Sequence, residues 1–149
     1  PEQAPAAVPI WQRPAAGPPP HAPRPLVERL GSVPALNPHQ ALDNLGGSTA
    51  ALERVLASFV KAYRHGAPGL LDEPTAEAAE RWRAVCHSLR GACGAIGAEA
   101  LVRQTQALEQ QLQAGLDPAS LKAQAQALHA ELVRLAGLLE ARLASDRVN

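Results

Sequence analysis

The sequence predicts an all-α fold: an antiparallel four-helix bundle with a short extra helix at its N-terminal end, preceded by a disordered proline-rich linker. Beyond residue 48, four long stretches carry apolar residues at the three- and four-residue spacing of a helix face. Of the 149 residues, 46% are hydrophobic but only 3% are aromatic, so the core must be built from Leu, Val and Ala, which suits closely packed helices. The short loops between the stretches favour antiparallel neighbours.

Residues 1–36 are expected to be a flexible linker. Of the 14 prolines, 11 fall at or before Pro38, mixed with Ala, Gly and Gln. Such a segment buries too little apolar surface to order itself, and its prolines favour extended conformations. Within it, Trp11 and the pair Val27 and Leu30 are candidates for local docking. The folded domain is then predicted to cover residues 37–146, with a short tail over residues 147–149.

The first predicted helix starts at Asn37 and Pro38, because the Asn side chain can cap a helix and proline suits its first position. This short helix should end at Gly46-Gly47. Ser48 then caps a long helix that weakens between Gly66 and Gly69. The apolar stripe expected on the long helix consists of Leu52, Val55 or Leu56, Phe59 and Tyr63.

The central helix restarts at Pro74-Thr75, and Gly97 closes it as a C-terminal glycine cap. Read at about 100° per residue, its apolar residues fall within one narrow stripe that we expect to face the core. This stripe consists of Trp82, Val85, Leu89, Cys93 and Ile96.

The last two helices show the same kind of pattern. The first is expected to end at Gly115 and to turn its glutamines to solvent, while Asp117-Pro118 starts the second. The buried residues predicted for the first are Leu101, Thr105, Leu108 and Leu112. The second carries a steady seam for helix packing at Leu121, Ala125, Leu128, Leu132, Leu135 and Leu139.

His87 is placed on the opposite side of the central helix, roughly 160° around from the apolar stripe. Arg83 precedes it by one turn, Arg90 follows it by one turn, and Gly91 and Gly94 share its face. Each glycine inside a helix costs about 1 kcal/mol relative to alanine. Two glycines beside an exposed histidine therefore suggest that something comes close to the backbone there.

A motif surrounds this histidine. The run Cys86-His87-Ser88-Leu89-Arg90-Gly91 is followed by Ile96-Gly97-Ala98, by Leu101 and by Leu108-Glu109. It resembles the signature of histidine-containing phosphotransfer (HPt) domains, which reads small residue, His, any residue, Leu, Lys, Gly, then a Gly-Ala turn and a Leu-Glu pair on the next helix. The resemblance extends from about Leu36 to about Ala144 and includes Leu45-Gly46-Gly47 and Phe59. The family usually has lysine where this chain has Arg90.

The resemblance implies an HPt-like bundle in which His87 is the phospho-accepting residue of a bacterial two-component phosphorelay. His87 would accept a phosphoryl group from the aspartate of a receiver domain and pass it to the aspartate of a response regulator. Arg90 and Arg83 are expected to stabilise the phosphoryl group. Gly91, Gly94 and Ser88 are expected to form the docking surface. No metal ligand or cofactor is expected in this chain, because the partner receiver domain would supply the Mg²⁺.

The chain shows no Gly-x-x-x-x-Gly-Lys-Ser/Thr loop and no glycine-rich ATP lid. We therefore expect a phosphotransferase module without ATP-dependent kinase activity of its own. A proline-rich tether before such a domain resembles the end of an unorthodox hybrid sensor histidine kinase of the BvgS or EvgS type. The expected partners are the receiver domain of that parent kinase and a cognate response regulator. The domain would be cytoplasmic, and the parent an inner-membrane sensor.

Composition argues against several other classes of protein. Lys and Arg total 14 against 14 Asp and Glu, so the net charge of +0 gives no electrostatic footprint for nucleic acid. An apolar run of about 18 residues is missing, so no membrane contact is expected. Cys86 and Cys93 lie about 10 Å apart along one helix, too far for a disulfide. A zinc site formed by them with His87 is disfavoured, because the histidine faces away from Cys93.

Two alternative hypotheses stay open. One is a non-catalytic docking or adaptor bundle, including a degenerate HPt domain in which His87 is inert. The other is a fragment of a histidine-kinase dimerisation domain, although such domains typically place an acidic residue next to the histidine, where this chain has Ser88. The remaining histidines lack comparable arginine and glycine neighbours and are interpreted as incidental: His21, His39, His65 and His129.

Overall fold

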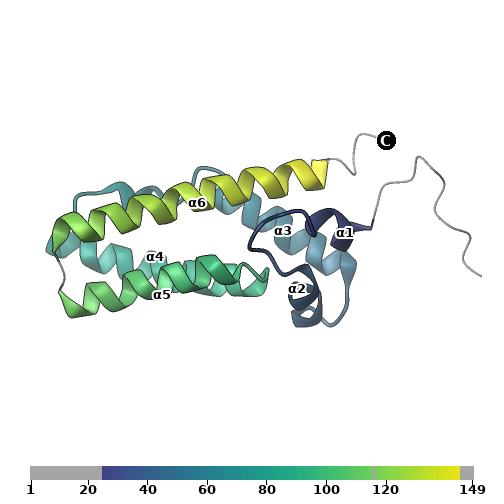
Figure 1. Ribbon diagram of the computed structural model, residues 1–149, viewed down its shortest axis with the longest axis horizontal. Helices are drawn as coiled ribbons and strands as arrows, with labels where there is room; N and C mark the ends of the chain where they lie inside the picture. Colours follow the sequence, from purple (N-terminus) through teal and green to yellow (C-terminus); the bar gives the residue numbers. More distant parts are fainter. Residues whose placement is uncertain (1–24, 116, 145–149) are drawn as a thin grey trace, which may run out of the picture.

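The computed structural model describes residues 25–115 and 117–144, and its regular elements are all helical over these ranges. They are α1 (Leu26–Leu30), α2 (Pro38–Asn44), α3 (Thr49–Tyr63), the short 3₁₀ helix η2 (Pro68–Leu71), α4 (Ala76–Ala95), α5 (Glu99–Ala114) and α6 (Pro118–Ala144). Figure 1 shows α6 running the length of the molecule, α4 and α5 side by side, and α1 and α2 near one end. The long helices α3 to α6 form the predicted four-helix bundle. None of the described helices is long and apolar enough to cross a bilayer.

Short polar side chains start α2, α3 and α4. Asn37, Ser48 and Thr75 each accept a hydrogen bond of 3.1 Å from the backbone N–H three residues further on. Such a bond satisfies one of the N–H groups that the first turn of a helix leaves without a partner. The caps predicted at Asn37 and Ser48 are confirmed.

The turn between α4 and α5 fixes how these two helices meet. The Ala98 N–H donates to the Cys93 carbonyl at 2.8 Å, and the Gly97 N–H donates to the Gly94 carbonyl at 3.2 Å. This pair of hydrogen bonds at a helix C-terminus requires a residue with left-handed backbone geometry, and Gly97 has a φ of 74°. A side chain on Gly97 would also overlap the Asn37 carbonyl, which lies against it. The predicted glycine cap is therefore confirmed, and it brings the start of α2 to this turn.

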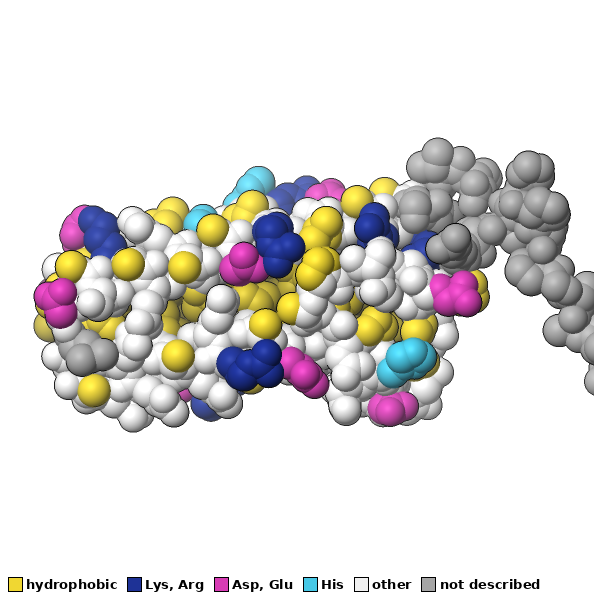
Figure 2. Space-filling model, viewed as in Figure 1, with side chains coloured by type: hydrophobic (Ala, Val, Ile, Leu, Met, Phe, Trp, Pro, Cys, Tyr) yellow, Lys and Arg dark blue, Asp and Glu magenta, His cyan; other side chains and the backbone are white. Residues whose placement is uncertain are grey.

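The core is the set of apolar seams on the facing helices. Every residue predicted for the seams of α5 and α6 is buried. In α4 one residue differs: Cys86 is fully buried, whereas Val85 is only half-buried and lies toward α3 and η2. Residues 82, 86, 89 and 93 follow the 4-3-4 spacing of a single face, which leaves Val85 at its edge. Figure 2 shows apolar side chains gathered in the furrow between α6 and α5, with charged side chains along its rims.

Residues 26–36, predicted from their composition to belong to the linker, are folded. Helix α1 buries Leu26 and Leu30, and Val33 follows them into the core, while Val27 is half-buried. The Arg29 side chain donates to the Arg142 carbonyl of α6 at 2.6 Å, which ties α1 to the end of the longest helix. The 4-3 spacing of Leu26, Leu30 and Val33 is the signal for this packing, but the prolines around it make the composition resemble a linker. Trp11 and the tail residues 147–149 lie outside the described residues.

Candidate functional site

His87 is exposed near the middle of α4, a helix of 20 residues. Cys86 directly before it and Leu89 two residues after it are both 0% exposed. These buried neighbours fix the rotation of α4 about its own axis. The imidazole is consequently held on the outer face, as the sequence predicts.

Both arginines that flank His87 are already in ion pairs. Arg83 pairs with Glu80 on the same helix, and the Arg90 Nη1 lies 3.3 Å from the Glu109 Oε2 on α5. The side chains of the first pair are 45% and 75% exposed, and those of the second are 42% and 22% exposed. The exposed Arg83–Glu80 pair contributes about 0–1 kcal/mol. The Arg90–Glu109 pair is half-buried, but its guanidinium is exposed enough for an incoming anion to reach it, as it can reach Arg83.

Gly91 and Gly94 lie exposed on the face of His87, together with Ser88. A Cβ atom added to either glycine would meet no atom within 4 Å, apart from the helix's own backbone. Neither glycine has a positive φ. The fold itself therefore does not require glycine at these two positions, although both reduce the helix propensity of α4.

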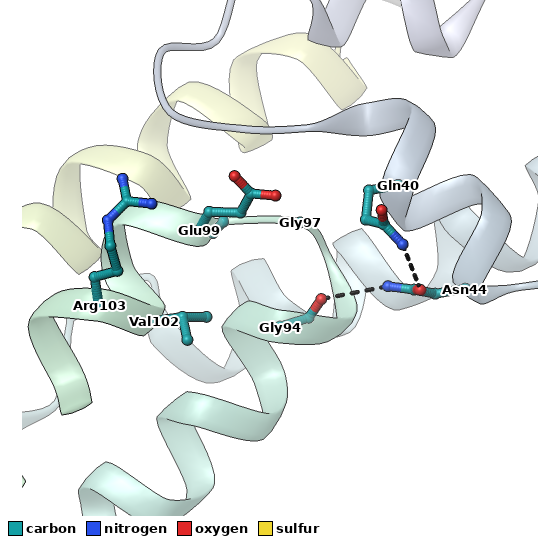
Figure 3. A pocket seen from close by; sticks show the side chains of 8 residues that line it. Gln40, Asn44, Gly94, Gly97, Glu99, Val102 and Arg103 are labelled. Atoms are coloured by element: carbon teal, nitrogen blue, oxygen red, sulfur yellow. Dashed lines mark hydrogen bonds between the residues drawn. The ribbon is translucent and has the colours of Figure 1, made fainter.

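A hollow of about 370 Å³ lies at the Gly94 end of this face, between α2 and the α4–α5 turn. Figure 3 shows Glu99 and Arg103 of α5 on one side of it and Gln40 and Asn44 of α2 on the other. The Gln40 Nε2 donates to the Asn44 Oδ1 at 3.0 Å, and the Asn44 Nδ2 donates to the Gly94 carbonyl at 3.4 Å. Helix α2 thus reaches the backbone of the helix that carries His87.

A second groove, of about 360 Å³, flanks α4 on the side of α3 and η2. Ser88, the neighbour of His87, lies in its lining with Val85, Tyr63 and Pro68. The groove depends on the angle between helices that are far apart in the sequence. The apolar periodicity of a single helix therefore does not predict it.

Two side chains hold the α3–α4 connection that forms the wall of this groove. The His129 Nδ1 on α6 accepts a hydrogen bond from the Ala67 N–H at 3.1 Å, and the Trp82 Nε1 donates to the Gly69 carbonyl at 2.8 Å. The His129 ring lies so close to Gly66 that a side chain there would overlap it. His129 is therefore a structural residue and not an incidental one. His39 and His65 are exposed, and His21 lies outside the described residues.

Cys86 and Cys93 are free thiols buried in the core. The pKa of each thiol is raised to about 12, mainly by burial, and for Cys86 the nearby Glu109 carboxylate adds to this increase while Arg90 opposes it. Both stay protonated at neutral pH, and neither points out with His87. In the part of the chain that the structure describes, no group of three or more His, Cys, Asp or Glu residues is arranged to hold a metal ion.

His87 is thus exposed in the middle of a bundle helix, on the same face as Gly91 and Gly94, where the fold leaves open space. A comparison with protein-family models matches the Hpt domain over residues 49–144. The chain belongs to the Hpt domain family. Neither the curated proteins nor the solved structures gave a match. The HPt match covers α3 to α6, so α1 and α2 lie outside it.

Membership in this family gives the general role of the chain. HPt domains carry out histidine phosphotransfer in two-component phosphorelays, and they interact with receiver domains and response regulators. The bundle helices α3 to α6 lie inside the matched range. His87 is a residue of α4, one of these helices.

Proposed function

We propose that His87 is the phospho-accepting residue of this HPt domain, and that it relays a phosphoryl group from a receiver aspartate to the aspartate of a response regulator. One observation carries the proposal: His87 is exposed in mid-helix beside Gly91, over which there is open space. A partner active site can approach the ring there without moving any part of the bundle.

In the proposed reaction, an unprotonated ring nitrogen of His87 attacks the phosphorus of the partner's aspartyl phosphate. An N–P bond forms while the P–O bond to the aspartate breaks, and the aspartate leaves as a carboxylate. The onward step is the reverse of this reaction on a second aspartate. Arg90 and Arg83 supply positive charge beside the phosphoryl group, and Gly91, Gly94 and Ser88 allow the partner to dock. The Mg²⁺ would belong to the receiver domain, so this chain supplies position and charge.

Incubation with a phosphorylated receiver domain and Mg²⁺ tests the proposal. We expect acid-labile, alkali-stable label on the wild-type chain and none on His87→Gln, whose melting temperature should be nearly unchanged because the side chain is exposed. His65→Gln is the matched control, since it removes another exposed histidine and should keep full labelling. Label on the His87→Gln variant would place the site elsewhere.

The same assay separates the alternatives. An adaptor or degenerate HPt domain would bind the receiver without taking label. A kinase dimerisation fragment would take label from an added ATP-binding domain and ATP, and would be labelled poorly by the receiver.

We also infer that the domain works in the cytoplasm as part of a bacterial hybrid sensor histidine kinase. The proline-rich composition ahead of α1 supports this, because such stretches join the modules of multidomain proteins. Sequencing the complete reading frame that encodes this domain tests the inference, because a hybrid kinase would carry receiver and kinase modules in the same chain. A frame that encodes no receiver or kinase module would contradict the inference.

A further inference from the structure

The two carboxylate oxygens of Glu109 have different surroundings. Its Oε2 pairs with Arg90 at 3.3 Å, while its Oε1 is shut off from solvent and has no hydrogen-bond partner. A carboxylate oxygen in that state is costly, because it has lost water without gaining a donor. Leu108 and Leu112, both buried in the core, fix this part of α5 and so keep the carboxylate in place.

The position of this anion relative to His87 follows from α4. Arg90 is three residues after His87, and side chains at that spacing are neighbours on a helix surface. The pair is also close to Cys86, since the charges of Glu109 and Arg90 both act on the pKa of that thiol. Glu109 is the more buried partner, at 22% exposure against 42% for Arg90. Arg90 therefore stands between a held anion and the surface on which the phosphoryl group would form.

A guanidinium group has five N–H donors, so an arginine held by one carboxylate can still bind a second anion. The carboxylate has two effects on such an arginine. It restricts the orientation of the guanidinium group, and it neutralises part of the positive charge that attracts the second anion. A relay intermediate needs both effects, because a phosphoryl group that is bound too strongly is not passed on.

We propose that Glu109 is a positioning residue that acts through Arg90: it holds the guanidinium beside His87 and lowers its attraction for the phosphoryl group, so that phosphohistidine stays transferable. The proposal rests on His87 being the phospho-accepting residue. Under this proposal the Glu109 carboxylate, paired through one oxygen only, sets the equilibrium between phosphohistidine and the aspartyl phosphate of the partner.

The Glu109→Gln variant tests this, because glutamine keeps the shape and one oxygen acceptor but removes the charge. At equilibrium with a receiver domain, the ratio of phosphohistidine to aspartyl phosphate should rise about three- to tenfold, and transfer onward should slow. Glu80→Gln is the matched control. It removes the partner of the other arginine, at a carboxylate that is 75% exposed, and should change the ratio less than about twofold.

The double variant Arg90→Ala/Glu109→Gln shows whether Glu109 acts through Arg90. Relative to Arg90→Ala alone, the added change should leave the phosphohistidine ratio unaltered. If Glu109→Gln raises the phosphohistidine ratio as much in the Arg90→Ala protein as it does in the wild-type chain, Glu109 acts on the phosphoryl group directly. That result would overturn the proposal. An unchanged ratio in Glu109→Gln itself would also overturn it.

A measurement on the wild-type chain needs neither a variant nor a receiver. Phosphoramidate, a small phosphoryl donor, should load His87 and shift the NMR signal of the Arg90 Nε–H, while the signal of Arg103 on α5 should stay in place. An unmoved Arg90 signal on a loaded domain would contradict this inference alone. Failure of any donor to load His87 would instead contradict the proposed function.

Discussion

At the scale of single residues, the backbone requires glycine at position 97 but not at position 91. Gly97 has a left-handed backbone and lies against the Asn37 carbonyl, so the fold allows no other residue there. Gly91 has ordinary helical geometry and open space where a side chain would go. Stability alone would favour alanine at Gly91, which makes it the residue at which stability and docking can be separated by experiment.

We therefore expect Gly91→Ala to stabilise the domain by up to about 1 kcal/mol while slowing phosphoryl transfer. The physical reason is that the methyl group favours the helix but occupies space that a partner loop would use. Denaturant unfolding and the rate of label transfer measure the two effects on the same sample. Transfer at the wild-type rate would show that close approach at Gly91 is unnecessary.

His129 gives the opposite case, a residue whose removal should damage structure more than chemistry. His129→Ala leaves the N–H of buried Ala67 without its acceptor, and we expect a loss of about 1–3 kcal/mol in the free energy of unfolding. Label should still reach His87, though more slowly if the groove wall loosens. Urea unfolding checks the stability, with the exposed His65→Ala as a control that should change it by less than about 0.5 kcal/mol.

At the scale of elements, the sequence predicts those features that depend on one helix at a time. The buried positions of α5 and α6 follow from their own spacing, and the exposure of His87 follows from its angle to Trp82 and Leu89. The Arg90 to Glu109 pair and the groove beside Ser88 were not predictable in the same way. They depend on the register and angle between helices, which no periodicity within one helix encodes.

Helix α1 was missed for a different reason. With five residues it is too short to be stable alone, and its formation depends on packing against the rest of the bundle. Proline-rich flanks on both sides make the local composition look disordered, although Leu30 is fully buried. The burial of Leu26 and Leu30, with Val27 packed beside them, is enough to order this short helix despite the proline-rich sequence around it.

The packing of α1 leads to a test of whether it belongs to the domain. Leu30→Ala should lower the free energy of unfolding by about 2–5 kcal/mol, because it opens a cavity in a fully buried site. The exposed Leu71→Ala on η2 serves as the control and should have a small effect. Equal, small losses in the two variants would mean that α1 is a docked tail and not part of the cooperative unit.

At the scale of the whole molecule, the buried residues from α1 to α6 form one continuous core. Cys86 and Cys93 lie within it, and burial raises the pKa of both thiols to about 12 from an ordinary value of 9.0. Between pH 9 and about pH 12, the thiols of the unfolded chain lose their protons, whereas those of the folded chain keep them. The free energy of unfolding should therefore be independent of these groups below about pH 9 and should fall as the pH rises toward 12.

The expected slope is at most about 1.4 kcal/mol per pH unit for each thiol. Urea titrations between about pH 8 and about pH 10.5 measure it, and the Cys86→Ala/Cys93→Ala variant should lose part of the slope even though its overall stability is lower. Identical slopes in the two proteins would show that other groups cause the alkaline loss.

The hydrogen bond between Trp82 and Gly69 also provides an optical reporter. The indole of Trp82 is fully buried, and its N–H is held by the connection that forms one wall of the groove beside Ser88. Trp11 is the second of the two tryptophans in the chain. In a Trp11→Phe protein, every change of emission wavelength or lifetime would come from an indole on the helix that carries His87. Partner binding at this helix can thus be followed in real time without attaching a dye.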